Sequence, residues 1–360
     1  MRVALLYGGR SVEHVVSTRS AAQILKQLNQ SSYEVIPIAI SRQGQWSVQN
    51  DARASMEALP ATFNANHEVT IRPARGLYCN NKSLNVDICF PVCHGSEGED
   101  GMLQGLLELA HLPYVGCNAP TSALCMNKHQ AKLSAQSAGV PVLDSLLMRS
   151  SETPNIELIH HQLGSSLIVK PNDGGSSVGV TALPESNQSS LEAALKHCYR
   201  FSCLALIEPL VAPCWEIECA LVSTDTGLCV SEPGLVINPQ LQGNSFLTYE
   251  QKYLGHNTAY IHVPAPLEAS LAQRIQKYAL LVGNALDVHG YARVDFLYQP
   301  HNKELYFNEI NTLPGMTEKS HFPVLAMSMG YSWQTLVQLL IEQGLVKASQ
   351  RQALEYRDVE

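Results

Sequence analysis

The stretch FNEINTLPGMT, Phe307–Thr317, holds a carboxylate and a carboxamide two residues apart in an apolar run, and a Pro-Gly turn follows them at once. The run reads as a β-strand, in which residues two apart share a face of the sheet. We therefore expect one side of this strand to be lined by Leu305, Phe307, Glu309 and Asn311. The question is why a chain would place polar side chains on that face and break the strand just there.

A second polar pair lies on the strand predicted over GYARVDFLY, where Arg293 and Asp295 share a side. If the two strands are neighbours, Asp295, Glu309 and Asn311 converge. Two carboxylates and a neutral oxygen donor suit a hard divalent cation such as Mg²⁺, which keeps only one or two protein carboxylates. An alternative of similar weight is a buried salt bridge of Arg293 with Asp295 or Glu309 that closes a sheet edge.

A glycine-rich loop, VKPNDGGSSVGV, provides a second candidate site. Gly174, Gly175, Ser176 and Ser177 offer backbone N–H groups and hydroxyls just after Lys170, which ends a predicted strand. Such a loop can surround phosphate oxygens, and the lysine supplies positive charge. It is not a Walker A loop, because no G-K-[ST] follows the glycines. An ordinary hairpin turn explains the same residues equally well.

Two further loops follow predicted strands, GGRSVEH and CHGSEGEDG. Glycines after the first strand permit a ligand to approach the carboxyl end of a parallel sheet. Glu13 could hold an ammonium group there, or it could be an acid favoured by the helix macrodipole. Capping of the helix predicted near Met102 explains either Glu99 or Asp100 without any function.

Composition limits the class of protein. The 360 residues predict two or three packed units, and a formal net charge of −8 argues against a broad basic surface for nucleic acid. No stretch approaches the length of a membrane-spanning helix. The ten cysteines form no C-x-x-C pair and several lie in apolar runs, which predicts reduced thiols in a cytoplasm. No G-x-S-x-G, H-E-x-x-H or G-x-G-x-x-G is present.

Alternating strands and helices predict an α/β fold with a parallel sheet. The sequence predicts a βαβ unit made of a strand at 2–7, a helix over VVSTRSAAQILKQL and a strand at 34–40. It then predicts a buried strand at 86–92, a helix from Met102 and a short strand over PYVG. SALCMNKHQAKLSAQSAG is predicted to be one helix. The polar, irregular stretch about 239–258 is predicted to be a lid rather than core.

Taken together, these segments resemble the D-alanine–D-alanine ligases of the ATP-grasp superfamily. Four family patterns occur in order, as GGRSVEHVVS, HGSEGEDGMLQG, KPNDGGSSVGV and NEINTLPGMT. The matches extend from Gly8 to Pro323, and four in order are highly specific. The resemblance implies a Rossmann-like N-terminal domain at 1–117, a central ATP-grasp subdomain at 118–206 and a C-terminal one at 207–360. ATP would lie between the last two.

The resemblance also implies which residues bind ATP and metal. The ATP-phosphate contacts would be Lys128 and Lys170 with Ser177 of the glycine-rich loop, and Lys252 would lie near the end of the lid. Glu208 and Glu216 match acids near the adenine and ribose, although the segment EPLVAPCWE departs from the family pattern in its length and its prolines. Two Mg²⁺ ions, or Mn²⁺, would be held by Asp295, Glu309 and Asn311.

The implied reaction forms D-alanyl phosphate from D-alanine and ATP, and a second D-alanine then displaces the phosphate. Glu13 matches the residue that holds the first substrate's ammonium, with Ser176 and Tyr253 as its hydrogen-bonded partners. Arg293 and the N–H of Gly315 match the groups that stabilise the oxyanion, and Ser320 matches a contact to the second substrate's carboxylate.

The lid residues bear on the second substrate. Ligases that make D-alanyl-D-alanine carry a Lys-Tyr pair, supplied here by Lys252 and Tyr253, whereas resistance-type enzymes that use D-lactate lack the tyrosine. This favours D-alanine over D-serine or D-lactate. A non-catalytic ATP-binding relative is the alternative from another class, and the intact metal and oxyanion residues argue against it. The resemblance further implies a cytoplasmic homodimer that serves peptidoglycan synthesis and binds neither nucleic acid nor membrane.

Overall fold

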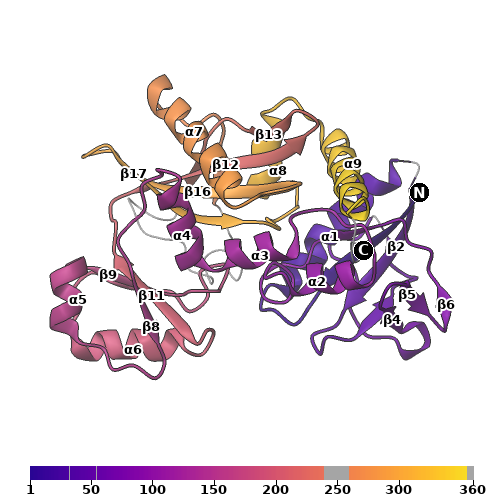
Figure 1. Cartoon of the computed structure of the whole chain (residues 1–360), viewed down its shortest axis with the longest axis horizontal. Helices are drawn as coiled ribbons and strands as arrows, with labels where there is room; N and C mark the ends of the chain where they lie inside the picture. Colours follow the sequence, from indigo (N-terminus) through magenta and orange to yellow (C-terminus); the bar gives the residue numbers. More distant parts are fainter. Residues whose placement is uncertain (32, 54, 239–258, 355–360) are drawn as a thin grey trace, which may run out of the picture.

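The computed structural model describes residues 1–31, 33–53, 55–238 and 259–354. Its described strands form four sheets, and the elements gather into three units that meet near the middle of the molecule (Figure 1). The predicted α/β class with parallel strands is confirmed.

The first unit is built around the apolar strand β1, which is buried on both faces as expected for the middle of a parallel sheet. The sheet order is β3-β2-β1-β7, in which β1 is parallel to β2 and β7 while β3 is antiparallel to β2. A small antiparallel sheet of order β4-β5-β6 lies in the same unit. The elements are β1 (Arg2–Gly8), α1 (His14–Asn29), β2 (Glu34–Ile40), β3 (Trp46–Val48), η1 (Ala65–His67), β4 (Val69–Arg72), β5 (Gly76–Cys79), β6 (Lys82–Ser83), β7 (Ile88–Pro91) and α2 (Met102–Leu109).

Two short helices, α3 (Ala119–Met126) and α4 (Lys128–Ser137), lead from the first unit to the second. The second unit is an antiparallel sheet of order β10-β9-β11-β8, with its own apolar core shared with α5 and α6. The glycine-rich loop joins the antiparallel neighbours β9 and β10, and β11 continues beyond Leu206 to Pro209. The elements are β8 (Leu146–Arg149), α5 (Ile156–Leu163), β9 (Leu167–Pro171), β10 (Thr181–Leu183), α6 (Gln188–Cys198) and β11 (Leu204–Pro209).

The third unit has an antiparallel sheet of order β15-β14-β12-β16-β17, with β13 paired to β12. Helices α3, α4 and α7 pack against one face of this sheet. Helices α8 and α9 share an apolar core with β1 and α1, so the C-terminal part of the chain returns to the first unit (Figure 1). The elements are β12 (Trp215–Thr224), β13 (Gly227–Val230), β14 (Gly234–Ile237), β15 (Tyr260–His262), α7 (Ala269–Ala285), β16 (Tyr291–Gln299), β17 (Glu304–Asn311), α8 (His321–Met327) and α9 (Trp333–Gln352).

Two sequence predictions about secondary structure are wrong. The helix predicted over SALCMNKHQAKLSAQSAG is divided at Asn127, whose backbone is extended and whose Oδ1 accepts from the N–H of Gln130 over 3.0 Å. Asparagine competes well as an N-cap, so it ends one helix and begins the next. The strand predicted over PYVG is only an isolated bridge between Tyr114 and Cys89, because Pro113 has no N–H to extend the ladder.

A third correction concerns the face of β17. Phe307 pairs with Phe296 and Glu309 pairs with Asp295, so Asn308 is an extra residue that forms a β-bulge. The bulge reverses the alternation of side chains: Leu305, Phe307 and Ile310 lie in one apolar core. Glu309 and Asn311 therefore face away from Phe307 instead of sharing its side.

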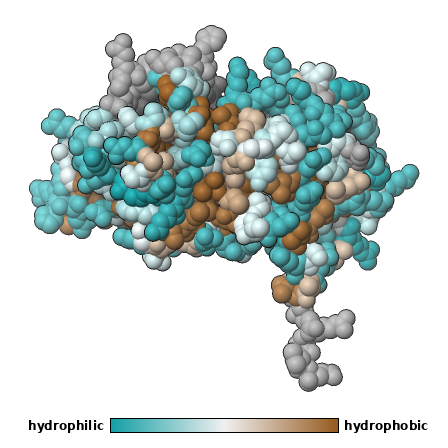
Figure 2. Space-filling view, turned by 90° about the horizontal axis from the view of Figure 1, so that it is seen from above, coloured by the Kyte–Doolittle hydropathy of each residue, from teal (hydrophilic) through white to brown (hydrophobic). Residues whose placement is uncertain are grey.

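The face of the molecule seen in Figure 2 is mostly hydrophilic. Figure 2 views the molecule from the side of α7 in Figure 1, and shows hydrophobic residues gathered near the middle of that face, between hydrophilic ends. Apolar atoms contribute a large part of the accessible surface of folded proteins, so exposed apolar residues are expected.

Candidate active site

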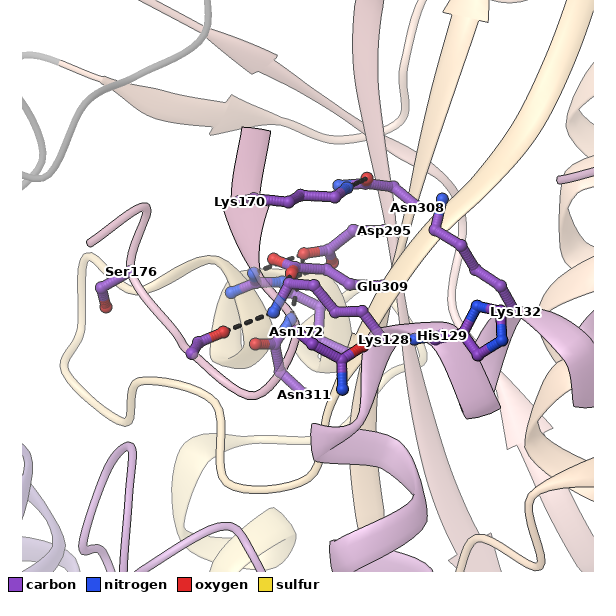
Figure 3. Close-up of polar contacts among 12 residues, drawn as sticks. Lys128, His129, Lys132, Lys170, Asn172, Ser176, Asp295, Asn308, Glu309 and Asn311 are labelled. Carbon is purple, nitrogen blue, oxygen red and sulfur yellow. Dashed lines mark hydrogen bonds and ion pairs between the residues drawn. The ribbon is translucent and has the colours of Figure 1, made fainter. Parts of the chain in front are cut away.

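The predicted metal ligands lie on antiparallel neighbours, and the register brings them together. Glu309 of β17 lies opposite Asp295 of β16, and Nδ2 of Asn311 donates to Oδ2 of Asp295 over 3.0 Å. Figure 3 shows the three side chains gathered at one place beneath the strands. The expected convergence is confirmed, and the bulge at Asn308 is what aims Glu309 and Asn311 toward Asp295.

Arg293 makes the salt bridge that was the alternative interpretation. Its Nε and Nη2 donate to the two carboxylate oxygens of Asp295, each over 2.7 Å, and Nε also lies 3.2 Å from Oε2 of Glu218. Nδ1–H of His321 donates to the same Glu218 oxygen over 2.9 Å. A bidentate pair of this kind fixes the plane of the guanidinium group. Arg293 is thereby held rigid at the centre of the carboxylate cluster.

The cluster holds more negative charge than Arg293 neutralises. Burial raises the pKa of Asp295, and the carboxylates of Glu218 and Glu309 raise it further, although Arg293 opposes them. No group of three His, Cys, Asp or Glu side chains arranged for a metal occurs among the described residues. The donors are instead two carboxylates and an amide, which are hard oxygen ligands. These residues fit a divalent cation of the Mg²⁺ or Mn²⁺ type.

Lys128 contacts residues of both the second and the third unit. The cap at Asn127 places Lys128 at the first position of α4, and its Nζ donates to the carbonyl of Gly174 in the glycine-rich loop. The same Nζ lies 3.3 Å from Oε2 of Glu309. One ammonium therefore connects the loop with a predicted metal ligand (Figure 3).

Lys170, the residue before the last in β9, pairs with a buried acid. Its Nζ lies 2.6 Å from Oε2 of Glu208 and 3.2 Å from Oδ1 of Asn308, the bulged residue. Burial alone would raise the pKa of Glu208, but Lys132 and Lys170 together lower it. Glu208 is 1% exposed, so it acts here as a charge partner of lysines. A place near the adenine, implied by the resemblance, stays a prediction.

A small cavity lies between the loop, α4 and β17. It is bounded by Glu99, Lys128, Gly174, Glu309 and Asn311 among others, and its volume is about 10 Å³. That volume holds about one water molecule. A phosphate group is larger than this space, so it does not fit there while the side chains keep these positions.

The glycine-rich loop also contacts the first unit. Oγ of Ser176 donates to Oε1 of Glu13, which is buried. Ser176 and Ser177 have φ of 51° and 57°, a conformation that serine rarely adopts. Strained residues of this kind cluster at ligand sites. The loop thus lies between Glu13 on one side and Lys128 on the other.

The Pro-Gly turn after β17 packs against the start of α8. Oγ of Ser320, the N-cap residue of α8, accepts from the N–H of Thr317 over 3.0 Å. A Cβ on Gly315 would lie 2.8 Å from Oγ of Ser320. Only glycine permits this approach without displacing the serine, so the turn holds Gly315 and Ser320 side by side.

For the three remaining predicted residues, the structure gives little or no information on their predicted roles. Glu216 lies half-buried on β12, opposite Leu297 of β16. Lys252 and Tyr253, with the rest of the predicted lid, lie outside the described residues. The roles inferred for all three stay predictions.

Sequence reasoning missed the function of Glu99, which it treated as a possible helix cap. Oε2 of Glu99 accepts from the N–H of Gly95 over 2.9 Å, and Oε1 accepts from the N–H of Leu313 over 3.2 Å. Burial and the nearby Glu13 raise the pKa of Glu99 to about 8. Glu99 therefore ties the first unit to the turn after β17. The only signal in the sequence was its place in a loop after a strand.

His94 makes a second connection to the same turn. Its Nδ1–H donates to the carbonyl of Leu313 over 2.7 Å, so Nε2 of the neutral ring accepts from Oγ of Ser20 at 3.0 Å. Burial lowers the pKa of His94, which favours this neutral form. Oγ of Ser20 in turn accepts from the N–H of Met316 over 3.3 Å. Side chains of the first unit thus hold both ends of the Pro-Gly turn.

All ten cysteines are free thiols, in agreement with the prediction of a reduced protein. Among the described helices, none combines the length and the apolar character needed to cross a membrane.

Comparisons with known proteins identify the family of this chain. Residues 2–117 match the family described as D-ala D-ala ligase N-terminus, and residues 135–342 match the one described as D-ala D-ala ligase C-terminus. The D-alanine–D-alanine ligase of Bradyrhizobium sp. (strain ORS 278) is 38% identical over 360 residues, which cover 96% of each chain. D-alanine–D-alanine ligase A of Mesorhizobium japonicum is 37% identical over 96% of this chain and 98% of its own.

Three solved structures are similar over nearly the whole chain. The D-alanine-D-alanine ligase of Coxiella burnetii has a TM-score of 0.81 and 28% identity, covering 98% of this chain and 97% of its own. D-alanyl-alanine synthetase A of Vibrio cholerae has a TM-score of 0.82 and 29% identity, with coverage of 96% and 98%. The VanG D-Ala:D-Ser ligase of Enterococcus faecalis has a TM-score of 0.81 and 30% identity, with coverage of 95% and 99%.

Proposed function

Because this chain belongs to the D-alanine–D-alanine ligase family, we propose that it joins two D-alanine molecules into D-alanyl-D-alanine with ATP, through a D-alanyl phosphate intermediate. The dipeptide would serve peptidoglycan precursor synthesis. The observation that carries the proposal is the convergence of cations and hard oxygen donors from two units at one place, namely Lys128, Lys170, Arg293, Asp295, Glu309 and Asn311.

The first step transfers the γ-phosphoryl group of ATP to the carboxylate of one D-alanine and releases ADP. Phosphoryl transfer needs positioning and neutralisation of charge more than covalent help. Lys128 and Lys170 would bind the phosphates, with backbone N–H groups of the loop around Ser177. Asp295, Glu309 and Asn311 would hold two Mg²⁺ or Mn²⁺ ions, which when bound neutralise phosphate charge. Lys128 would exchange its present partner Glu309 for phosphate oxygen.

The second step forms the peptide bond. The amine of a second D-alanine attacks the carbonyl carbon of D-alanyl phosphate, the bond to the phosphate oxygen breaks, and inorganic phosphate leaves as the amine loses a proton. Negative charge develops on the carbonyl oxygen. Arg293, held in one plane by Asp295, and the N–H of Gly315 would stabilise that charge. Their preorganisation matters because fixed donors need no rearrangement during the reaction.

The substrates would be held by groups from all three units. Glu13 would bind the ammonium of the first D-alanine, in a position fixed by its hydrogen bond from Ser176. Ser320, the residue before α8, would bind the carboxylate of the second through its hydroxyl group. Tyr253 and Lys252 of the predicted lid would complete the closed site.

A second candidate is a ligase that uses D-serine as its second substrate. The observation in its favour is the similarity to the VanG D-Ala:D-Ser ligase over 95% of this chain. The Lys252-Tyr253 pair and the relatives named D-alanine–D-alanine ligase favour D-alanine.

The test is phosphate release from ATP with Mg²⁺ and D-alanine, followed by the same assay with D-serine or D-lactate added. Release with D-alanine alone, with D-alanyl-D-alanine as product, supports the main proposal. Release that requires D-serine moves the chain to the second candidate. No release with any of these substrates refutes both.

We also propose that the protein is a cytoplasmic homodimer. One face of α2 exposes apolar side chains, with Met102 66% and Leu109 69% exposed, and the ten free thiols suit a reducing compartment. Sedimentation of the wild type and of a variant with Met102→Glu and Leu109→Glu tests the dimer. A monomeric wild type refutes it, and an unaltered dimer in the variant refutes the role of α2.

A further inference from the structure

A buried lysine that neither the motifs nor the proposed mechanism uses lies behind the phosphate-binding residues. The side chain of Lys132, on α4, is 3% exposed, and its Nζ lies 2.6 Å from Oε1 of Glu208. Burial lowers the pKa of Lys132 to about 8, while Glu208 opposes that shift. An ammonium group is rarely buried this completely unless it is paired. The burial of Lys132 therefore indicates a specific role for its charge.

Glu208 connects Lys132 to the predicted ATP site. One carboxylate oxygen pairs with Lys132, and the other lies 2.6 Å from Nζ of Lys170. Lys170 then donates to Asn308, next to the predicted metal ligand Glu309. Figure 3 shows Lys132 coming from α4 and Lys170 from β9. A continuous line of charged groups thus runs from the interior of the protein to the site.

The charges along this line determine what Lys170 can offer to a phosphate. Lys132 and Lys170 each carry +1 and Glu208 carries −1, so the three groups carry +1 in total. Without Lys132, the carboxylate of Glu208 would neutralise Lys170 in full. Interactions of buried charges are strong because the local dielectric constant is low, and salt screens them little. The positive charge that reaches the site at Lys170 therefore depends on Lys132.

We propose that Lys132 is a positioning residue for nucleotide binding: it shares the carboxylate of Glu208 with Lys170, and so leaves Lys170 with net positive charge for the phosphates of ATP. Lys132 itself does not contact the nucleotide, because it is enclosed behind Glu208. The inference rests on the proposed function, since it assumes that Lys170 binds ATP phosphates.

A simpler role for Lys132 would be structural, as a buried ion pair that joins α4 to β11. Removing one member of such a pair is strongly destabilising, because the other charge is left buried and unpaired. That role predicts a loss of stability in Lys132→Met with unchanged affinity for nucleotide in the folded fraction. The two roles are separated by measuring binding and unfolding on the same samples.

The experiment compares the binding of ADP with Mg²⁺ and the binding of adenosine by calorimetry, alongside urea unfolding. In Lys132→Met we expect the Kd for ADP to rise about tenfold, equivalent to about 1.4 kcal/mol, with little change for adenosine, which has no phosphates. Lys132→Arg keeps the charge and should bind ADP nearly as the wild type does. If Lys132→Met does not fold, Lys132→Gln removes the charge while keeping a hydrogen-bond donor, and provides the same comparison.

A double variant supplies the sharpest control. Lys132→Met with Glu208→Gln leaves Lys170 alone, which restores the net charge of +1. If Lys132 acts through Glu208, the double variant should bind ADP more tightly than Lys132→Met does. Additive weakening in the double variant would overturn the inference, as would equal ADP affinity of Lys132→Met and the wild type. A wild type that binds no ADP would instead refute the proposed function.

Discussion

Replacing Gly95 by alanine should damage the site and the fold together, and the structure gives the size of the effect. Gly95 has φ of +74°, and a Cβ there would lie 2.3 Å from Oε2 of Glu13 and 3.2 Å from Oγ of Ser11. The first distance is well below any normal contact, so the carboxylate of Glu13 must move. Glu13 accepts a hydrogen bond from Ser176, and movement of the carboxylate would break that bond.

The magnitude has two parts. Alanine in the left-handed region costs about 1–2 kcal/mol relative to its usual conformations. Loss of a hydrogen bond to a charged group costs about 1.5–3 kcal/mol. Gly95→Ala should therefore lower the free energy of unfolding by about 2.5–5 kcal/mol, a large fraction of the roughly 5–15 kcal/mol typical of folded proteins. If Glu13 binds the ammonium of the first D-alanine, kcat/KM for D-alanine should fall by roughly 10- to 150-fold.

Gly139→Ala is the matched control. Gly139 has φ of +80°, but a Cβ there would meet nothing within 4 Å, so only the backbone term of about 1–2 kcal/mol applies. Urea unfolding and phosphate release at varied D-alanine concentration measure both effects. Equal losses of stability in the two variants, or an unchanged kcat/KM in Gly95→Ala, would show that Glu13 is not held where the structure places it.

Three other predictions concern the metal cluster, pH and helix capping. Asp295→Asn should reduce phosphate release on the order of 100-fold in a folded protein, and near-normal turnover would refute its role. The pKa of Glu99 is raised to about 8, so the folded state binds the extra proton and the stability this contributes is lost as pH rises from about 4.5 to 8. Urea titrations should find a weaker pH dependence in Glu99→Gln, and identical slopes would contradict this. Asn127→Ala removes the N-cap of α4 and should lower the free energy of unfolding, measured with urea, by about 1 kcal/mol. An unchanged free energy of unfolding would mean that the cap does not stabilise the protein.

The sequence predicted the local parts of the site well, because each rests on short-range patterns. The apolar run of β1, the alternation along β16 and the glycines after β9 are read from neighbouring residues. The convergence of Asp295 with Glu309 followed from the assumption that two consecutive strands pair. Sequential strands often do pair, so that assumption was a sound one.

The bulge at Asn308 could not be predicted in the same way. Period-2 alternation assigned Phe307 and Glu309 to one face, and nothing in the residue types marks the extra residue. Only the pairing with β16 reveals it, because the register shifts between Asp295 and Phe296. The predicted ligands thus lie together although the face assigned to them was wrong: Asp295 shares the face of Glu309 and Asn311 because of the bulge.

Contacts between the units were equally hidden. Glu99 and Leu313 are 214 residues apart in the chain, and Ser20 and Met316 are 296 apart. No local pattern connects such residues, and each taken alone has an ordinary explanation as a cap or a packed side chain. Long-range hydrogen bonds of this kind are what place the Pro-Gly turn against the first unit.

The charges at the site suggest why nucleotide and divalent cation should bind together. Lys128 now pairs with Glu309, and Lys170 pairs with Glu208. A polyphosphate that takes Lys128 removes one cation from beside the carboxylates of Glu309 and Asp295, and a divalent cation can replace that positive charge. A divalent cation alone would compete with Lys128 for Glu309 and leave that ammonium with the carbonyl of Gly174 but without its carboxylate partner. Each ligand thus removes the penalty created by the other, so a strong mutual dependence of their affinities follows from the pairing of Lys128 with Glu309.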